Sequence, residues 1–323
     1  MTTYIGIDLG GTKIAAVAFD TAADTFSGQK VTPTEGHEGP DAVLKRAAAL
    51  VKDVCQHIGV RVAEIGGVGL GVPAVIDMDS GQTILLPNIP GDWNGRYVAP
   101  TVSQHLNRPV WLVNDARAFT LAEATRGAGH GARTVAGFTI GTGIGGGLVL
   151  DGRLHLGVNG TAGEVGHMII DPNGPLCGCG NRGCFEAHCS GPAIAAMGVK
   201  AVMQGMTTCI GDLANHDLNQ ITPQLMMQAA EAGDAVARDI LERAGEFLGI
   251  GIGNVITLFS PEKVVIGGGV SALGEWIFAP IRKTIKERCR AAPVDKVEIV
   301  RAALGTDAGA MGAAIWAAQK GEN

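Results

Sequence analysis

The chain has 323 residues, enough for two domains of ordinary size, and its hydrophobic content of 46% supports sizeable cores. Its formal net charge of -6 argues against binding to nucleic acids or anionic membrane surfaces. The odd number of cysteines and the absence of a signal peptide or an apolar run of transmembrane length indicate a reduced, cytoplasmic protein.

The first predicted element is a β-hairpin, formed by two short apolar runs at residues 4–9 and 14–19. Asp8 lies near the end of the first strand. The turn between the strands contains Gly10, Gly11, Thr12 and Lys13. Backbone N–H groups in such a turn, helped by a hydroxyl and an ammonium group, can bind phosphate. The alternative is that the glycines only reverse the direction of the chain.

Between residues 39 and 127 helices and strands alternate. The spacing of apolar residues predicts helices at 39–58, 97–106 and 116–127 and strands at 65–72 and 109–115. Asn114 and Asp115 stand at the carboxyl end of the second strand, where open α/β sheets bind their ligands. Asp115 is therefore a candidate catalytic residue, and the alternative is that it only caps the following helix.

A second hairpin begins with the strand predicted at residues 134–140, which runs into a glycine-rich turn and a further apolar run. Gly141, Gly143 and Gly146 match the dinucleotide-binding pattern G-x-G-x-x-G, but that pattern requires a helix directly after the turn, and a strand follows here. Two strand–turn–strand units predict two related α/β lobes that bind one phosphorylated ligand. Gly141 and Thr142 then form a second phosphate loop.

The segment from residue 167 to 186 combines one histidine with three cysteines. These residues are His167, Cys177, Cys179 and Cys184. Thiolates and an imidazole so close together in a Gly/Pro/Asn-rich loop favour a closed, tetrahedral structural zinc site over free cysteines or a disulfide. Glu164 precedes the segment and Glu186 ends it, so we expect the same metal to hold these two carboxylates near each other.

The rest of the chain predicts a mainly helical region and another glycine-rich strand end. We expect helices at 192–205, 222–232, 234–259, 274–290 and 306–319, and strands beginning at 263 and 296. Gly268 and Gly269 permit close approach of a flat group such as adenine, or form only a tight turn. From topology, we expect a smaller lobe of residues 1–115, a larger lobe of 116–305, and a C-terminal helix, 306–323, that returns to the smaller lobe.

Six motifs occur along the chain: DLGGTK, LVNDARAF, IGTGIGGG, GEVGH, CGCGNRGCFE and VIGGGVS. Through them nearly the full length resembles the ROK family of bacterial sugar kinases, repressors and open reading frames. CGCGNRGCFE after GEVGH is highly specific, whereas DLGGTK is shared more widely. The resemblance implies an α/β, two-lobed actin-like ATPase (ribonuclease H-like) fold with a zinc-stapled loop, in which nucleotide and sugar bind between the lobes.

The resemblance also implies roles for individual residues. Asp115 is expected to be the general base that accepts the proton of a sugar hydroxyl, and Asp8 to hold hydrated Mg²⁺. The ligands of the other sugar hydroxyls are expected to be Asn114, Glu164, His167 and Glu186. The expected zinc ligands are His167, Cys177, Cys179 and Cys184. The residues expected to bind ATP are Gly10, Gly11, Thr12, Lys13, Gly141, Thr142 and Gly143 at the phosphates, and Gly268 and Gly269 at the adenosine.

The implied activity is ATP-dependent phosphorylation of a hexose at its 6-hydroxyl, with glucose as the favoured substrate. Alternatives within the family are kinases of N-acetylmannosamine, N-acetylglucosamine or fructose, and polyphosphate as the phosphoryl donor. A sugar-sensing repressor is disfavoured, because too few residues precede the first strand to form a winged helix-turn-helix and because Asp115 is present. The family suggests a homodimer or homotetramer.

Two positions depart from the family pattern. Ala74 stands where the family often has glycine in GxPG, so it could alter the backbone on the sugar side. Arg117, two residues after Asp115, stands where many of these kinases have a smaller or uncharged side chain. We expect Arg117 to face solvent, and the alternative is a role in specificity or phosphate binding.

Overall fold

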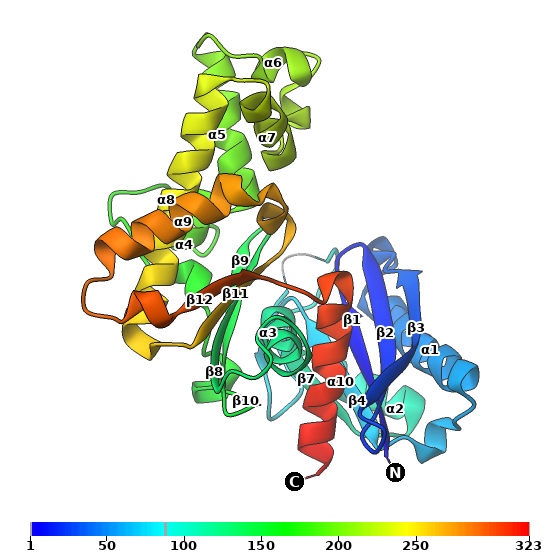
Figure 1. Cartoon of the computed structure of the whole chain (residues 1–323). Coiled ribbons are helices and arrows are strands. Elements are labelled where there is room, and N and C mark those ends of the chain that lie inside the picture. The colour runs from blue at the N-terminus through cyan, green and yellow to red at the C-terminus, as the bar shows by residue number, and fades with distance from the viewer. Residues whose placement is uncertain (1, 87–88, 323) are drawn as a thin grey trace. The chain divides into compact units, whose positions relative to one another are not determined.

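In the computed structural model, which describes residues 2–86 and 89–322, the chain folds into two compact units (Figure 1). Unit 1 comprises Met1–Arg133, Gly147–Gly163 and Ala303–Asn323, and unit 2 comprises Thr134–Gly146 and Glu164–Ala302. The terminal residues 1 and 323 of the predicted lobes lie outside the described residues. None of the described helices combines the length and the apolar character needed to cross a bilayer.

Unit 1 is built on a five-stranded sheet with the order β3-β2-β1-β4-β7. Strand β2 runs antiparallel to both β1 and β3, whereas β4 runs parallel to both β1 and β7. The strands are β1 (Thr3–Leu9), β2 (Lys13–Asp20), β3 (Thr25–Pro33), β4 (Gly67–Val72) and β7 (Val110–Asn114). The helices are α1 (Pro40–Ile58), α2 (Val98–Leu106), α3 (Asp115–Arg126) and α10 (Ala308–Gly321). A separate hairpin is formed by β5 (Val75–Asp77) and β6 (Gln82–Leu85).

The alternation of side chains along β1 gives this sheet two buried faces. Ile5 and Ile7 belong to the large core that includes the apolar face of α1. Tyr4, on the opposite face, packs with alanines of α10. Gly69 of β4 lies so close to α10 that a Cβ atom there would be 1.8 Å from the carbonyl oxygen of Ala313. Small residues therefore let the C-terminal helix lie directly on the sheet of unit 1.

The second sheet has the order β10-β9-β8-β11-β12, and its β11 runs parallel to both β8 and β12. Its strands are β8 (Thr134–Ile140), β9 (Ile144–Leu150), β10 (Arg153–Leu154), β11 (Lys263–Gly267) and β12 (Glu298–Arg301). Strand β10 and residues 147–150 of β9 belong to unit 1. The helices of unit 2 are α4 (Phe185–Cys189), α5 (Gly191–Met203), α6 (Ile210–Leu213), α7 (Pro223–Glu231), α8 (Ala235–Phe259) and α9 (Glu275–Arg288).

The two sheets repeat one topology, in which a strand–turn–strand unit gains an antiparallel third strand on one side and two parallel strands on the other. The two predicted hairpins correspond to β1 and β2 in the first sheet and to β8 and β9 in the second. Because β9 rather than a helix follows the turn after β8, the rejection of a dinucleotide-binding motif is confirmed.

The structure contains elements that the sequence pattern did not reveal. β3 was missed because it is a polar edge strand whose residues are all exposed or half-buried, so it has no apolar run. The predicted domain boundary near residue 115 also differs from the compact units, because α3 packs against α10 and stays in unit 1. As an assignment of domains, that boundary stays a prediction.

Candidate active site

In unit 1, parallel strands bring several predicted site residues to one edge of the sheet. Asp8 of β1 is in register with Gly71 of β4, and Val72 of β4 is in register with Asn114, the last residue of β7. Parallel strands end at the same edge, which is where open α/β sheets bind ligands. The prediction that Asn114 and Asp115 stand at the carboxyl end of this strand is confirmed, because β7 ends at Asn114 and α3 begins at Asp115.

Asn114, rather than Asp115, is the N-cap of α3. Its side-chain oxygen accepts hydrogen bonds from the backbone N–H groups of Ala116 and Arg117, at 3.1 and 3.3 Å. Its amide nitrogen donates to the carbonyl oxygen of Ala74 at 3.4 Å. Asp115 is the first residue of the helix, where the positive end of the helix dipole stabilises a carboxylate. The capping role considered for Asp115 thus belongs to its neighbour.

Hydrogen bonds hold the backbone of the turn between β1 and β2, and the residues of the turn are open to solvent. The N–H of Gly10 donates to the carbonyl oxygen of Lys13 at 3.0 Å. Buried Thr34 donates from its hydroxyl to the carbonyl oxygen of Gly10 at 2.7 Å and from its N–H to that of Thr12 at 2.9 Å. Gly11, Thr12 and Lys13 are exposed. A rigid turn with exposed donors is suited to bind phosphate.

The Asp8 carboxyl group lies in surroundings that disfavour its negative charge. Burial raises the pKa of Asp8 to about 6, and the nearby Lys13 ammonium acts in the opposite direction. Among residues 2–86 and 89–322, no group donates a hydrogen bond to this carboxylate. A bound cation would therefore stabilise its ionised form, and Mg²⁺ takes oxygen ligands of this kind.

In unit 2, the turn after β8 contacts a predicted sugar ligand. The N–H of Gly141 donates to the carbonyl oxygen of Gly143 at 2.9 Å, and the N–H of Ile144 donates to Oε2 of Glu186 at 2.8 Å. A Cβ atom on Gly143 would lie 2.4 Å from the same oxygen, so a side chain there would displace the carboxylate. The predicted second phosphate loop is thus joined to the end of the cysteine-rich segment.

The predicted adenosine segment lies beside the same turn. Gly268, with a φ of 83°, packs against the backbone of Ile140, the residue before Gly141. Gln224 donates from its side chain to the carbonyl oxygen of Gly269 at 3.2 Å. Unit 2 therefore brings the predicted adenosine and phosphate segments together around the end of β8.

The four predicted metal ligands converge. One donor atom from each of His167, Cys177, Cys179 and Cys184 lies within 4.8 Å of the others. Nδ1 of His167 is 3.8 Å from Sγ of Cys177, and the sulfur atoms of Cys179 and Cys184 are 3.6 Å apart, too far for a disulfide. Burial and the neighbouring thiols raise the pKa of Cys184 to about 12. A bound cation would favour the thiolate and reverse this shift.

The cysteine-rich segment folds back on itself near its two carboxylates. His167 donates from its N–H to the carbonyl oxygen of Glu164 at 3.1 Å in a single 3₁₀ turn. Ile169 pairs with Cys184 in an antiparallel bridge. The chain that follows Glu164 therefore runs beside the chain that precedes Glu186.

Two charged residues of α3 are buried and hydrogen-bonded inside the protein, which the sequence analysis did not predict. Arg117 is 3% exposed, so the expectation that it faces solvent is wrong. Its Nε donates to the carbonyl oxygen of Ala162 at 2.7 Å. The buried carboxylate of Glu123 accepts hydrogen bonds from the N–H groups of Ala128, Ala303 and Leu304. The available signal was that α3 lacks a polar face, which leaves its charged side chains inside the protein.

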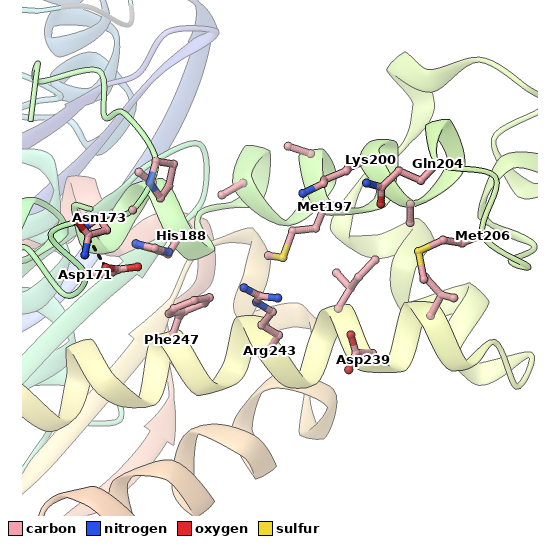
Figure 2. A pocket seen from close by; sticks show the side chains of 18 residues that line it. Asp171, Asn173, His188, Met197, Lys200, Gln204, Met206, Asp239, Arg243 and Phe247 are labelled. Atoms are coloured by element: carbon pink, nitrogen blue, oxygen red, sulfur yellow. Dashed lines mark hydrogen bonds between the residues drawn. The ribbon is translucent and has the colours of Figure 1, made fainter. Parts of the chain in front are cut away.

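A separate cavity of about 580 Å³ lies in unit 2 between α5 and α8 (Figure 2). The rings of His188 and Phe247 are in contact at one end, with centroids 4.4 Å apart and planes tilted by 35°, and Lys200 and Arg243 line its length. No predicted phosphate, sugar or metal ligand lines this cavity. The candidate site is therefore not in this cavity.

Comparisons with known proteins agree with these motifs. The sequence pattern of the ROK family matches residues 4–320. A glucokinase of Halalkalibacterium halodurans is 34% identical over 323 residues, covering 99% of this chain and 96% of that protein. A ROK hexokinase from Thermus thermophilus has a TM-score of 0.86 at 33% identity and covers 99% of each chain. A ROK family glucokinase from Streptomyces griseus, solved with glucose and AMPPNP, has a TM-score of 0.81 at 32% identity, covering 98% of this chain and 99% of that chain. The predicted mixed α/β fold is confirmed.

Removing the charge of Asp8 should stabilise the protein in buffer free of Mg²⁺ and nucleotide. The folded pKa of about 6 exceeds the unfolded value, so ionisation opposes folding: wild-type stability falls as the pH rises from about 4 to 6. Asp8→Asn should therefore gain up to about 3 kcal/mol near pH 8 and much less near pH 4.5, as measured by urea unfolding. The exposed Asp53→Asn variant is the control, and an Asp8→Asn effect equal at both pH values would contradict the assignment.

Proposed function

This chain belongs to the ROK family, and we propose that it transfers the γ-phosphoryl group of ATP to the 6-hydroxyl of a hexose, with glucose as the preferred acceptor. The observation that carries the proposal is a carboxylate, Asp115, at the N-terminus of α3, on the sheet edge where the parallel strands β1, β4 and β7 end and which also presents Asp8. The similarity to a glucokinase that binds glucose and AMPPNP supports this choice of substrates.

Asp115 acts as the general base. It accepts the proton of the 6-hydroxyl as that oxygen bonds to the γ-phosphorus, and the bond from phosphorus to the bridging oxygen of ADP breaks. Asp115 lies in the first turn of α3, where the helix dipole favours a negatively charged side chain, and Asn114 fixes that first turn. The products are a hexose 6-phosphate and ADP.

The two glycine turns bind the phosphates of ATP. Residues 10–13 offer exposed donors on a backbone fixed by Thr34, and residues 141–143 offer a second turn fixed by Glu186. Gly268 and Gly269 admit the adenosine beside the second turn. When bound, Mg²⁺ neutralises charge on the transferred phosphoryl group, and Asp8 is the carboxylate that holds its hydration shell.

The sugar is oriented by Asn114, Glu164, His167 and Glu186. Carboxylates form strong charge-assisted hydrogen bonds with several hydroxyl groups at once. His167 can serve both metal and sugar, because Nδ1 faces Cys177 and Nε2 is left for a hydroxyl group. In this arrangement Nδ1 of His167 has the structural role and Nε2 has the substrate-binding role.

The Cys/His cluster fits a structural zinc ion. With Zn–S bonds of about 2.3 Å, tetrahedral geometry separates two sulfur ligands by about 3.7 Å. The observed spacing of 3.6 Å between the sulfur atoms of Cys179 and Cys184 agrees with that value. The spacing of 3.8 Å between Nδ1 of His167 and Sγ of Cys177 lies within about 0.3 Å of the shorter separation expected for a nitrogen and a sulfur ligand. Four protein ligands leave no position for a reacting water, so the ion fixes the segment that carries His167 and Glu186 rather than taking part in the reaction.

Asp115→Asn should lower kcat for glucose by about 10²- to 10⁴-fold, because the amide keeps the shape of the side chain but cannot accept the proton. The dissociation constant for glucose, measured by calorimetry, should change little. Asp41→Asn, in the first turn of α1 and exposed, is the matched control and should keep the wild-type kcat. Near-wild-type turnover in Asp115→Asn would remove Asp115 as the base.

Cys179→Ser should lose most of the bound zinc and raise the KM for glucose together, because one of four ligands is weakened and the segment carrying His167 and Glu186 is released. Zinc content is measured by plasma mass spectrometry after gel filtration. Cys209→Ser, outside the cluster, should keep the metal. Full zinc occupancy in Cys179→Ser would exclude Cys179 as a ligand.

A further inference from the structure

The side chain of Arg46, in α1, holds the segment of residues 34–38 at both of its ends. This segment lies between the end of β3 and the start of α1. Nη1 of Arg46 donates to the carbonyl oxygen of Thr34 at 2.6 Å, and Nη2 donates to Oε2 of Glu38 at 2.5 Å. The Arg46 side chain is 24% exposed, so the guanidinium is half-buried where it makes these contacts. The guanidinium therefore ties both ends of the segment to the helix.

The segment contains a backbone conformation that needs such support. Glu35 has a φ of 49° and a ψ of 51°, in the left-handed region that residues other than glycine adopt only at a cost in free energy. A strained conformation persists where the surrounding contacts determine it. The two hydrogen bonds of Arg46 stand on either side of this residue, at Thr34 before it and at Glu38 after it. They therefore oppose relaxation of the segment.

Thr34 connects this segment to the proposed phosphate turn. Its hydroxyl group donates to the carbonyl oxygen of Gly10 at 2.7 Å, and its N–H donates to the carbonyl oxygen of Thr12 at 2.9 Å. Its own carbonyl oxygen is the group that accepts from Arg46. Thr34 has no exposed surface. A displacement of Thr34 by about 1 Å would take both contacts with the turn out of hydrogen-bonding range.

We infer that Arg46 is a positioning residue for the nucleotide, which sets the affinity for its phosphates by holding Thr34 against the turn of residues 10–13. The inference rests on the proposed binding of ATP phosphates by this turn. Arg46 does not bind phosphate in this role, because both terminal nitrogens of its guanidinium donate to groups of the protein. The whole set of contacts, from Glu38 to the turn, lies within unit 1.

The test compares the binding of Mg·ADP and of adenosine by calorimetry, with no sugar present. Arg46→Ala should raise the dissociation constant of Mg·ADP roughly 3- to 10-fold, the effect of about one hydrogen bond, because the turn is held less firmly. Adenosine has no phosphate, so its dissociation constant should change by less than about twofold. Arg46→Lys can reach one acceptor but not both, and should show a smaller loss that is also confined to Mg·ADP.

A double-mutant cycle with Thr34→Val tests whether the effect of Arg46 passes through Thr34. Valine keeps the shape of the side chain but removes the hydroxyl group that donates to Gly10. Thr34→Val should weaken the binding of Mg·ADP by itself, and Arg46→Ala should add less to it than it costs alone, because part of the contact it maintains is already lost. In steady-state kinetics, both single variants should raise the KM for ATP and leave the KM for glucose unchanged.

The matched control is Arg61→Ala, which removes an exposed guanidinium of unit 1 that pairs with Glu64. It should bind both ligands as the wild type does. Wild-type affinity for Mg·ADP in Arg46→Ala, an equal loss of affinity for adenosine, or independent effects of Arg46 and Thr34 in the cycle would overturn the inference.

Failure of the proposed function gives a different result. A wild-type protein that binds Mg·ADP but phosphorylates no hexose would refute the hexose kinase, and the comparison of Mg·ADP with adenosine would still decide the role of Arg46. A wild-type protein that binds no Mg·ADP would refute both.

Discussion

The hydrogen bond from the N–H of Ile144 to the carboxylate of Glu186 is the contact on which the site in unit 2 depends. It joins the turn after β8 to the first turn of α4, and it forms because Gly143 leaves room for the carboxylate. Glu186 follows Cys184 by two residues, so the Cys/His cluster and the glycine turn constrain the same side chain from two directions. Charge-assisted hydrogen bonds of this kind are strong and fix geometry, which supports the proposal that a structural metal site positions a sugar ligand.

In unit 1 the corresponding constraint is the shared edge of three parallel strands. Asp8 and Asn114 stand there because β1, β4 and β7 run in one direction, and α3 begins at that edge with Asp115. Ionisation of Asp8 destabilises the folded unit, because burial raises the pKa of this carboxyl group to about 6. Such a cost in stability supports the proposed role of Asp8 near a bound cation.

Local sequence patterns predicted the features that short segments determine, namely both hairpins, the strand that ends at Asn114, the long helices and the convergence of His167 with the three cysteines. They failed where long-range packing decides. Arg117 looked like a solvent-facing side chain because its burial depends on a loop that follows it by 45 residues in sequence. β3 has no apolar run because it needs only one neighbour at the edge of the sheet. The N-cap of α3 is Asn114 and not Asp115, for which capping was the alternative role; both Asn and Asp cap helices well, and only the backbone geometry distinguishes them.

The central claim, ATP-dependent phosphorylation of glucose, is tested most directly by following ADP release with Mg·ATP and a panel of sugars. The panel contains glucose, mannose, fructose, N-acetylglucosamine and N-acetylmannosamine, with 6-deoxyglucose as the acceptor that lacks the reacting hydroxyl. We predict the highest kcat/KM for glucose and no transfer to 6-deoxyglucose. A higher kcat/KM for an acetylated sugar or for fructose would contradict the assigned substrate. Absence of ADP release with every sugar would contradict the ATP-dependent hexose kinase itself.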